Sequence, residues 1–144
     1  MSTTSAPSTD LTALTTEDKN TLRTAAYGAV SLLAAADAAG SPHKVATHGT
    51  LALNAATGLI GHVLAEKTKI KNVNGRSTAE LADHVLPALT AAMTLLNQQN
   101  PAAAADFRST VNVAVDAATQ AHKGAPTPAM AAMTRKINGA LDAA

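Results

Sequence analysis

Three times in this chain a helix-capping residue stands directly before a proline, at Ser41-Pro42, Asn100-Pro101 and Thr127-Pro128. The side-chain oxygen of such a residue accepts a hydrogen bond from a free backbone N–H at the start of a helix. Proline fits the first helical position because its missing N–H is not needed there. The three pairs therefore predict three helix starts and divide the chain into helical segments.

Two further starts and two ends have their own signals. Ser77 to Glu80 has the spacing of a capping box, and Thr15 or Thr16 precedes two acidic residues that suit a helix N-terminus. Gly40 and Gly124 follow helical runs, and glycine readily takes the left-handed conformation that ends many helices. We expect Ser41 and Thr127 to cap their helices through their hydroxyls, and Asn100 through its side-chain amide oxygen.

These signals predict an all-α fold, an antiparallel bundle of four long helices with a shorter C-terminal fifth helix. We expect residues 1–14 to form a disordered Ser/Thr-rich tail without the features of a signal peptide, and residues 15–144 to form one domain. The predicted helices are Thr16–Ala39, Pro42–Lys69, Thr78–Gln99, Pro101–Lys123 and Pro128–Ala143.

Composition supports helices and excludes several functions. Alanine, the best helix former, dominates, and the only aromatic residues are Tyr27 and Phe107. The absence of cysteine excludes disulfides, cysteine-ligated zinc and iron–sulfur clusters. So few aromatic residues and a net charge of +1 make nucleic-acid binding an unlikely function. No apolar run has the length of a membrane span, so we expect a cytoplasmic protein with no membrane partner.

Apolar residues recur at helical spacing in every predicted helix, and the widest apolar stripe belongs to Pro42–Lys69. We therefore expect this helix to lie at the centre of the bundle. Leu53 and Val113 fall outside the stripes and mark a candidate oligomer contact. The predicted fifth helix follows a Gly-Ala-Pro-Thr-Pro connection and could dock on a partner subunit. The expected partner is another protein or a second copy, which would make a homodimer.

Two pairs of residues suggest a metal site. His62 and Glu66 are four apart, as are Glu80 and His84, so each pair shares one helix face. If their two helices run antiparallel, both histidines and both carboxylates come together, as in metal-binding bundles. The alternative is structural, because Glu80 is explained by the capping box and the Glu-x-x-His spacing of di-iron bundles is absent. No other cofactor is expected.

A basic stretch suggests an anion site. Lys69, Lys71 and Arg76 lead to Ser77, at the predicted start of a helix whose free N–H groups attract anions. The alternative is a solvated loop whose lysines complement the end of the preceding helix. His122 has a similar structural explanation, since it stands at a predicted helix C-terminus.

Three segments resemble small all-helical proteins of unassigned function from GC-rich bacteria: residues 21–30, 85–89 and 107–111. This resemblance implies a helical fold and no site. Ala36-Asp37 followed by Gly40-Ser41-Pro42 is similar to tellurite-resistance-type helical bundles, although the acidic ligands expected there are missing.

No motif places a nucleophile beside a base. We therefore predict a non-enzymatic interaction or structural protein that self-associates. The alternatives are a bundle that binds a metal or an anion at the residues above, and an enzyme with an unidentified site.

Overall fold

The computed structural model describes residues 14–37, 40–65, 77–122 and 124–144, and these residues form an all-α fold of six helices without strands. The helices are α1 (Thr16–Ala36), α2 (Pro42–Asn54), α3 (Gly58–Ala65), α4 (Thr78–Gln99), α5 (Pro101–Ala121) and α6 (Pro128–Asp142). The predicted starts of five helices are confirmed. Of the predicted tail, residues 1–13 lie outside the described part, whereas Leu14 is buried against the core.

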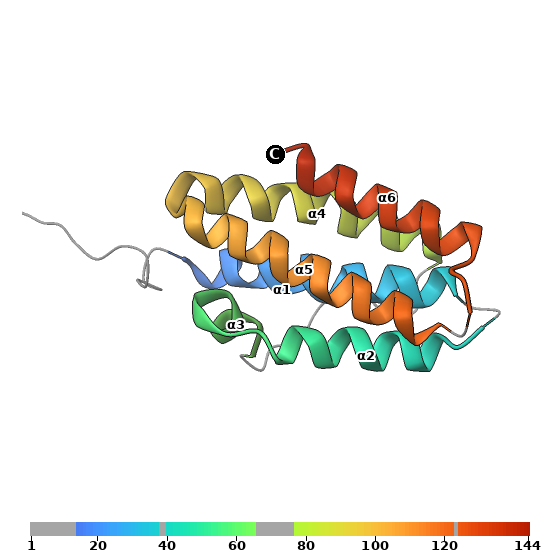
Figure 1. The fold of residues 1–144 in the computed structure, drawn as a ribbon. Coiled ribbons are helices and arrows are strands. Elements are labelled where there is room, and N and C mark those ends of the chain that lie inside the picture. The colour runs from blue at the N-terminus through green and yellow to red at the C-terminus, as the bar shows by residue number, and fades with distance from the viewer. Residues whose placement is uncertain (1–13, 38–39, 66–76, 123) are drawn as a thin grey trace, which may run out of the picture.

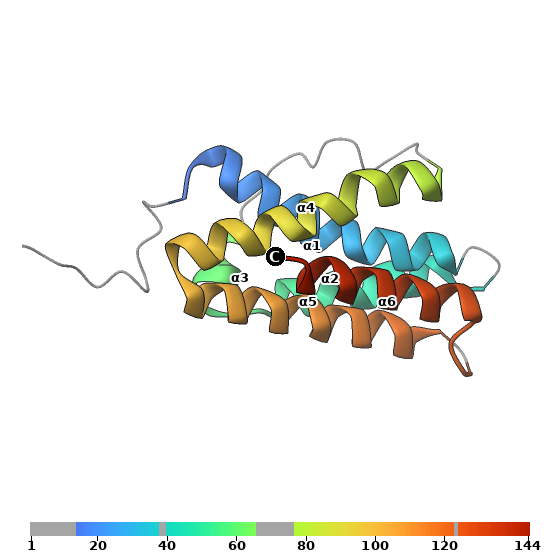
Figure 2. The same ribbon diagram turned by 90° about the horizontal axis from the view of Figure 1, so that it is seen from above.

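The helices pack lengthwise, and neighbours along the chain run antiparallel in the pairs α1–α2, α4–α5 and α5–α6 (Figure 1). Seen from above, α4 and α6 lie over α1 and α5 (Figure 2). The helix α1 contacts every other described helix, and its buried residues include Leu22, Leu32 and Leu33. The prediction that the second helix is central is therefore wrong, because α1 has that place and α2 packs mainly on α1 and α5.

The predicted helix Pro42–Lys69 is also wrong, because it is broken into α2 and α3 by an elbow at Ala55–Thr57. Gly58, the first residue of α3, takes a φ of +74°, a left-handed conformation that lets the chain turn from the elbow into α3. A Cβ at Gly61 would lie 2.2 Å from the carbonyl oxygen of Ala56, so the backbone folds back too closely for any side chain there. Gly58 and Gly61 thus permit a sharp turn at a point where the apolar spacing predicts a continuous helix.

The helix caps agree with the sequence in most cases. Thr15 forms a full capping box with Asp18, and the side chains of Asn100 and Thr127 accept hydrogen bonds from Ala103 and Met130. Ser41 makes no such bond, so its predicted cap is wrong. Gly124 has the expected positive φ of +87°. Gly40 has no positive φ and instead packs against the Asp37 carboxylate.

Small residues bring the helices close together. A Cβ on Gly28 of α1 would lie 2.5 Å from Cγ2 of Val85 in α4. A Cβ on Gly49 of α2 would lie 2.7 Å from Cγ1 of Val30 in α1. Where α1 crosses α4, Gly28 leaves room that Val85 fills. Where α2 crosses α1, Gly49 leaves room that Val30 fills. These two contacts set how closely α1 approaches its two antiparallel neighbours.

We expect Gly28→Ala to lower the free energy of unfolding by about 1–3 kcal/mol, because the added methyl overlaps a buried side chain. Gly139→Ala is the matched control, because Gly139 is an exposed residue of α6 and nothing lies within 4 Å of its Cβ position. The control should stabilise the protein by about 0.5–1 kcal/mol through helix propensity. Chemical denaturation followed by circular dichroism measures both. Equal effects of the two substitutions would contradict the close approach of α1 and α4.

Candidate functional site

The structure does not bring the predicted metal ligands together. His62 is exposed on α3, whereas Glu80 and His84 lie near the start of α4. Because α2 and α4 run in the same direction, α3 and the start of α4 lie toward different ends of the bundle (Figures 1 and 2). The expected antiparallel pairing of these segments is thus wrong. Within the described ranges, no three histidine, aspartate or glutamate residues could hold a metal, and Glu66 lies outside them.

The predicted anion site falls mostly on residues that the structure does not describe. Lys69, Lys71 and Arg76 lie outside the described residues. Ser77 is the N-cap of α4, and its hydroxyl accepts a hydrogen bond from the Glu80 N–H at 3.2 Å. The same hydroxyl donates to the Glu80 carboxylate at 3.1 Å. Ser77 therefore has a structural role as a cap, and the anion site stays a prediction.

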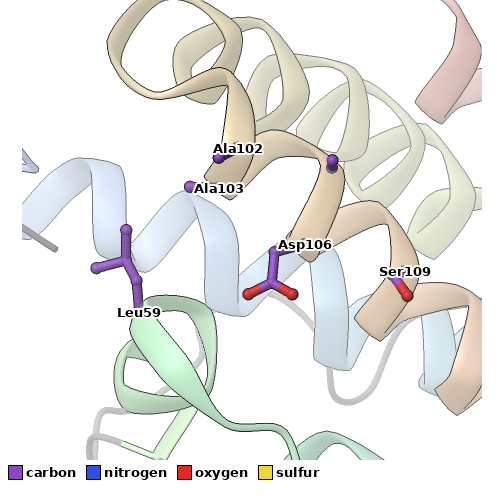
Figure 3. A pocket seen from close by; sticks show the side chains of 6 residues that line it. Leu59, Ala102, Ala103, Asp106 and Ser109 are labelled. Carbon is purple, nitrogen blue, oxygen red and sulfur yellow. The ribbon is translucent and has the colours of Figure 1, made fainter. Parts of the chain in front are cut away.

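Two open hollows lie between the elbow after α2 and the first half of α5. Their volumes are about 450 Å³ and 280 Å³. Asp106 and Ser109 of α5 line both hollows, and Figure 3 shows these two side chains in the larger one. The larger hollow is otherwise walled by Leu59 and alanines of α5. The smaller one adds alanines of α2 and the elbow, two threonines and Val113.

The chemistry of these hollows is simple. Asp106 is the single charged residue among those that line them, and the hydroxyls of Ser109, Thr57 and Thr110 are the other polar side-chain groups. The walls are otherwise methyl groups and the Leu59 side chain. Such a surface can hold an aliphatic chain that ends in a cation or a hydrogen-bond donor.

The hollow is shaped by the elbow, and the elbow is held by α1. The buried Arg23 donates from Nη1 to the carbonyl oxygen of Val63 at 3.0 Å. The Tyr27 hydroxyl lies 2.9 Å from the carbonyl oxygen of Leu64 and 2.9 Å from Oδ1 of Asn54. These carbonyls belong to the last turn of α3, where they have no partner within the helix and attract positive charge. Arg23 and Tyr27 thereby fix the end of α3 on α1.

A second anchor holds the other end of α2. Asp37 directly follows α1 in the sequence, and its side chain is buried. Its Oδ2 accepts a hydrogen bond from the Ser41 N–H at 2.9 Å. Its Oδ1 lies 2.8 Å from Nδ1 of His122, at the end of α5. Mainly because of the Ser41 hydrogen bond, the pKa of Asp37 lies below its usual value of 3.8, although burial opposes this shift. Asp37 thus ties α1, α2 and α5 together.

Between these anchors, α2 and α5 share an outer surface that we call the α2–α5 face. Its exposed residues include Lys44, His48, Leu51 and Ala55 on α2, and Asp106, Ser109, Val113, Asp116 and Gln120 on α5. Leu51 is 60% exposed and Val113 is 55% exposed, and they are the only exposed large hydrophobic residues in the described part of the chain. The expected exposure of Val113 is confirmed, whereas that of Leu53 is wrong because Leu53 is fully buried.

Sequence reasoning missed Leu51, Asp106 and the Asp37–His122 pair because their roles depend on which helices pack together. A continuous helix from Pro42 to Lys69 also puts the apolar stripe of α2 in the wrong phase, since Leu53 is buried and Ala55 is exposed. The glycines at positions 58 and 61, next to Asn54 and Thr57, were the available signal for a break. Nothing in the spacing of Asp37 and His122 indicates that two helix ends meet.

Asp37→Asn is expected to lower the free energy of unfolding at neutral pH by about 1–3 kcal/mol, since it removes the buried carboxylate charge that the Ser41 N–H stabilises. The pKa of Asp37 is lower in the folded protein, so its charge stabilises the fold above the unfolded value of 3.8. That contribution is lost as the pH falls through the folded pKa. The stability gap between wild type and variant should therefore shrink below about pH 4.

Denaturation curves at a series of pH values measure this gap. Asp116→Asn is the control, because Asp116 is an exposed aspartate on α5. The control should change the free energy of unfolding by less than about 0.5 kcal/mol. A gap for Asp37→Asn that stays constant down to pH 3 would show that its charge does not stabilise the fold.

No helix in the described ranges is long and apolar enough to cross a membrane. Comparison of the chain with protein-family models, curated proteins and solved structures found no match. The resemblance to small bacterial helical proteins therefore stays a prediction.

Proposed function

We propose that this protein is a non-enzymatic helical bundle that associates with a second copy of itself through the α2–α5 face. One observation carries the proposal: the two exposed large hydrophobic residues of the described chain lie on adjacent helices and flank one surface. Leu51 is one turn from Ala55, and Ala55 and Val113 line the same hollow. An exposed apolar surface rimmed by polar groups is typical of a protein interface.

The composition of the face also suits association of two helical layers. Alanines surround Leu51 and Val113, so the surface between them is shallow and a second helix pair can approach closely. The face is held in place at both ends, by Asp37 near the start of α2 and by Tyr27 near its end. A rigid surface loses little conformational entropy on association.

The test is the double variant Leu51→Ser with Val113→Ser. Its two serines remove apolar surface that would be buried in a dimer, so the dissociation constant should rise at least about tenfold. Sedimentation equilibrium over a wide range of protein concentration measures it. Ala91→Ser, at an exposed position of α4 across the bundle from α2, is the matched control and should leave the constant unchanged.

Two results would contradict the proposal. A wild-type protein that stays monomeric at the highest attainable concentration would remove self-association altogether. A dimer that the double variant leaves intact would place the interface elsewhere on the molecule.

A further inference from the structure

The α2–α5 face carries opposite charges toward its two ends. On α2 the exposed row runs from Lys44 through His48 to Leu51, with spacings of one turn. On α5 the exposed row runs from Asp106 through Ser109 to Val113 in the same way. Lys44 is the only lysine, arginine or acid in α2. The face is therefore basic at Lys44 on the α2 row and acidic on the α5 row, at Asp106 and, one turn beyond Val113, at Asp116.

The register of the two rows is symmetric. Lys44 stands seven residues before Leu51, and Asp106 stands seven residues before Val113. Seven residues of helix span about 10.5 Å. Because α2 and α5 run antiparallel side by side, Lys44 and Asp106 lie on opposite sides of the Leu51–Val113 centre at similar distances (Figure 1).

The surroundings of Asp106 suit a lysine side chain. Its carboxylate points from α5 toward α3 (Figure 3), with Leu59 and alanines of α5 on one side and Ser109 on the other. A lysine has four methylenes that can lie along methyl groups and an ammonium that can reach a carboxylate. Neither Asp106 nor Lys44 makes an ion pair with another residue of the described ranges. Each is thus available to a partner.

We infer that Lys44 of one copy enters the hollow beside Asp106 of a second copy, in a two-fold symmetric dimer. This inference rests on the proposed self-association and names the contacts that define it. A two-fold axis that bisects the line from Lys44 to Asp106 exchanges these two positions, so both ion pairs form at once. The same axis passes near the centre of the face and brings the exposed apolar residues of the two copies together.

Charge reversal tests the pairing directly. Lys44→Asp alone and Asp106→Lys alone each create two like-charge contacts per dimer, and each should raise the dissociation constant at least about tenfold at low salt. The double variant restores both pairs with reversed polarity and should return the constant to within about threefold of wild type. Both positions are exposed, and circular dichroism confirms that each variant is folded.

A matched control distinguishes a specific pair from a change in net charge. Asp83→Lys makes the same change as Asp106→Lys at an exposed position of α4, on the other side of the bundle from α2. It should shift the dissociation constant by less than about threefold, because Asp83 lies outside the α2–α5 face. A larger loss for Asp83→Lys than for Asp106→Lys would overturn the pairing.

A zero-length carboxyl–amine cross-link gives a second readout. In a mixture of isotope-labelled and unlabelled protein, a link between Lys44 and Asp106 should join peptides of different label. If the wild type dimerises but neither single variant changes the dissociation constant, the inference is overturned and the proposed self-association stands. The same holds if the double variant dissociates more readily than either single variant. A wild-type monomer at all concentrations overturns both. If the wild type dimerises but every Lys44–Asp106 cross-link joins peptides of the same label, the pairing is overturned and the self-association stands.

Discussion

The close approach of α1 to its neighbours is the constraint on which the rest of this structure depends. With one tyrosine and one phenylalanine, the chain cannot fill wide gaps between helices with aromatic rings. It instead removes side chains at Gly28 and Gly49 and packs a valine into each space. Dispersion contacts at short range replace the area that large side chains would bury. These two contacts thus set the spacing of α1 from α2 and α4, against which the other helices pack.

Much of the fold could be predicted from the sequence, because helix starts are local. The proline pairs and the Thr15 box specify their helices through atoms a few residues apart, and the structure has those helices. The elbow after α2 is different. Its turn depends on Gly61 lying against the Ala56 backbone, a contact that an apolar pattern does not indicate. Once the elbow was missed, the buried face of α2 and the neighbours of His62 could not be right.

The candidate site could be predicted only in part, since it is formed by two helices that are distant in sequence. Val113 was recognisable from its place outside an apolar stripe, but Leu51 and Asp106 gain their meaning from the packing of α2 on α5. The same holds for Asp37, which acts through partners from two other segments. Local signals determine which residues are helical, whereas the pairing of helices determines which side chains meet.

The contact of Tyr27 with α3 has a consequence for spectroscopy. Tyr27 is the only tyrosine and the chain has no tryptophan, so it is the dominant source of near-ultraviolet fluorescence. Its hydroxyl lies against a carbonyl of α3 and the side chain of Asn54, and burial raises its pKa. Emission and the alkaline absorbance change therefore report one event, the seating of α3 on α1. The molecule carries an intrinsic optical probe placed beside the elbow, where no label needs to be added.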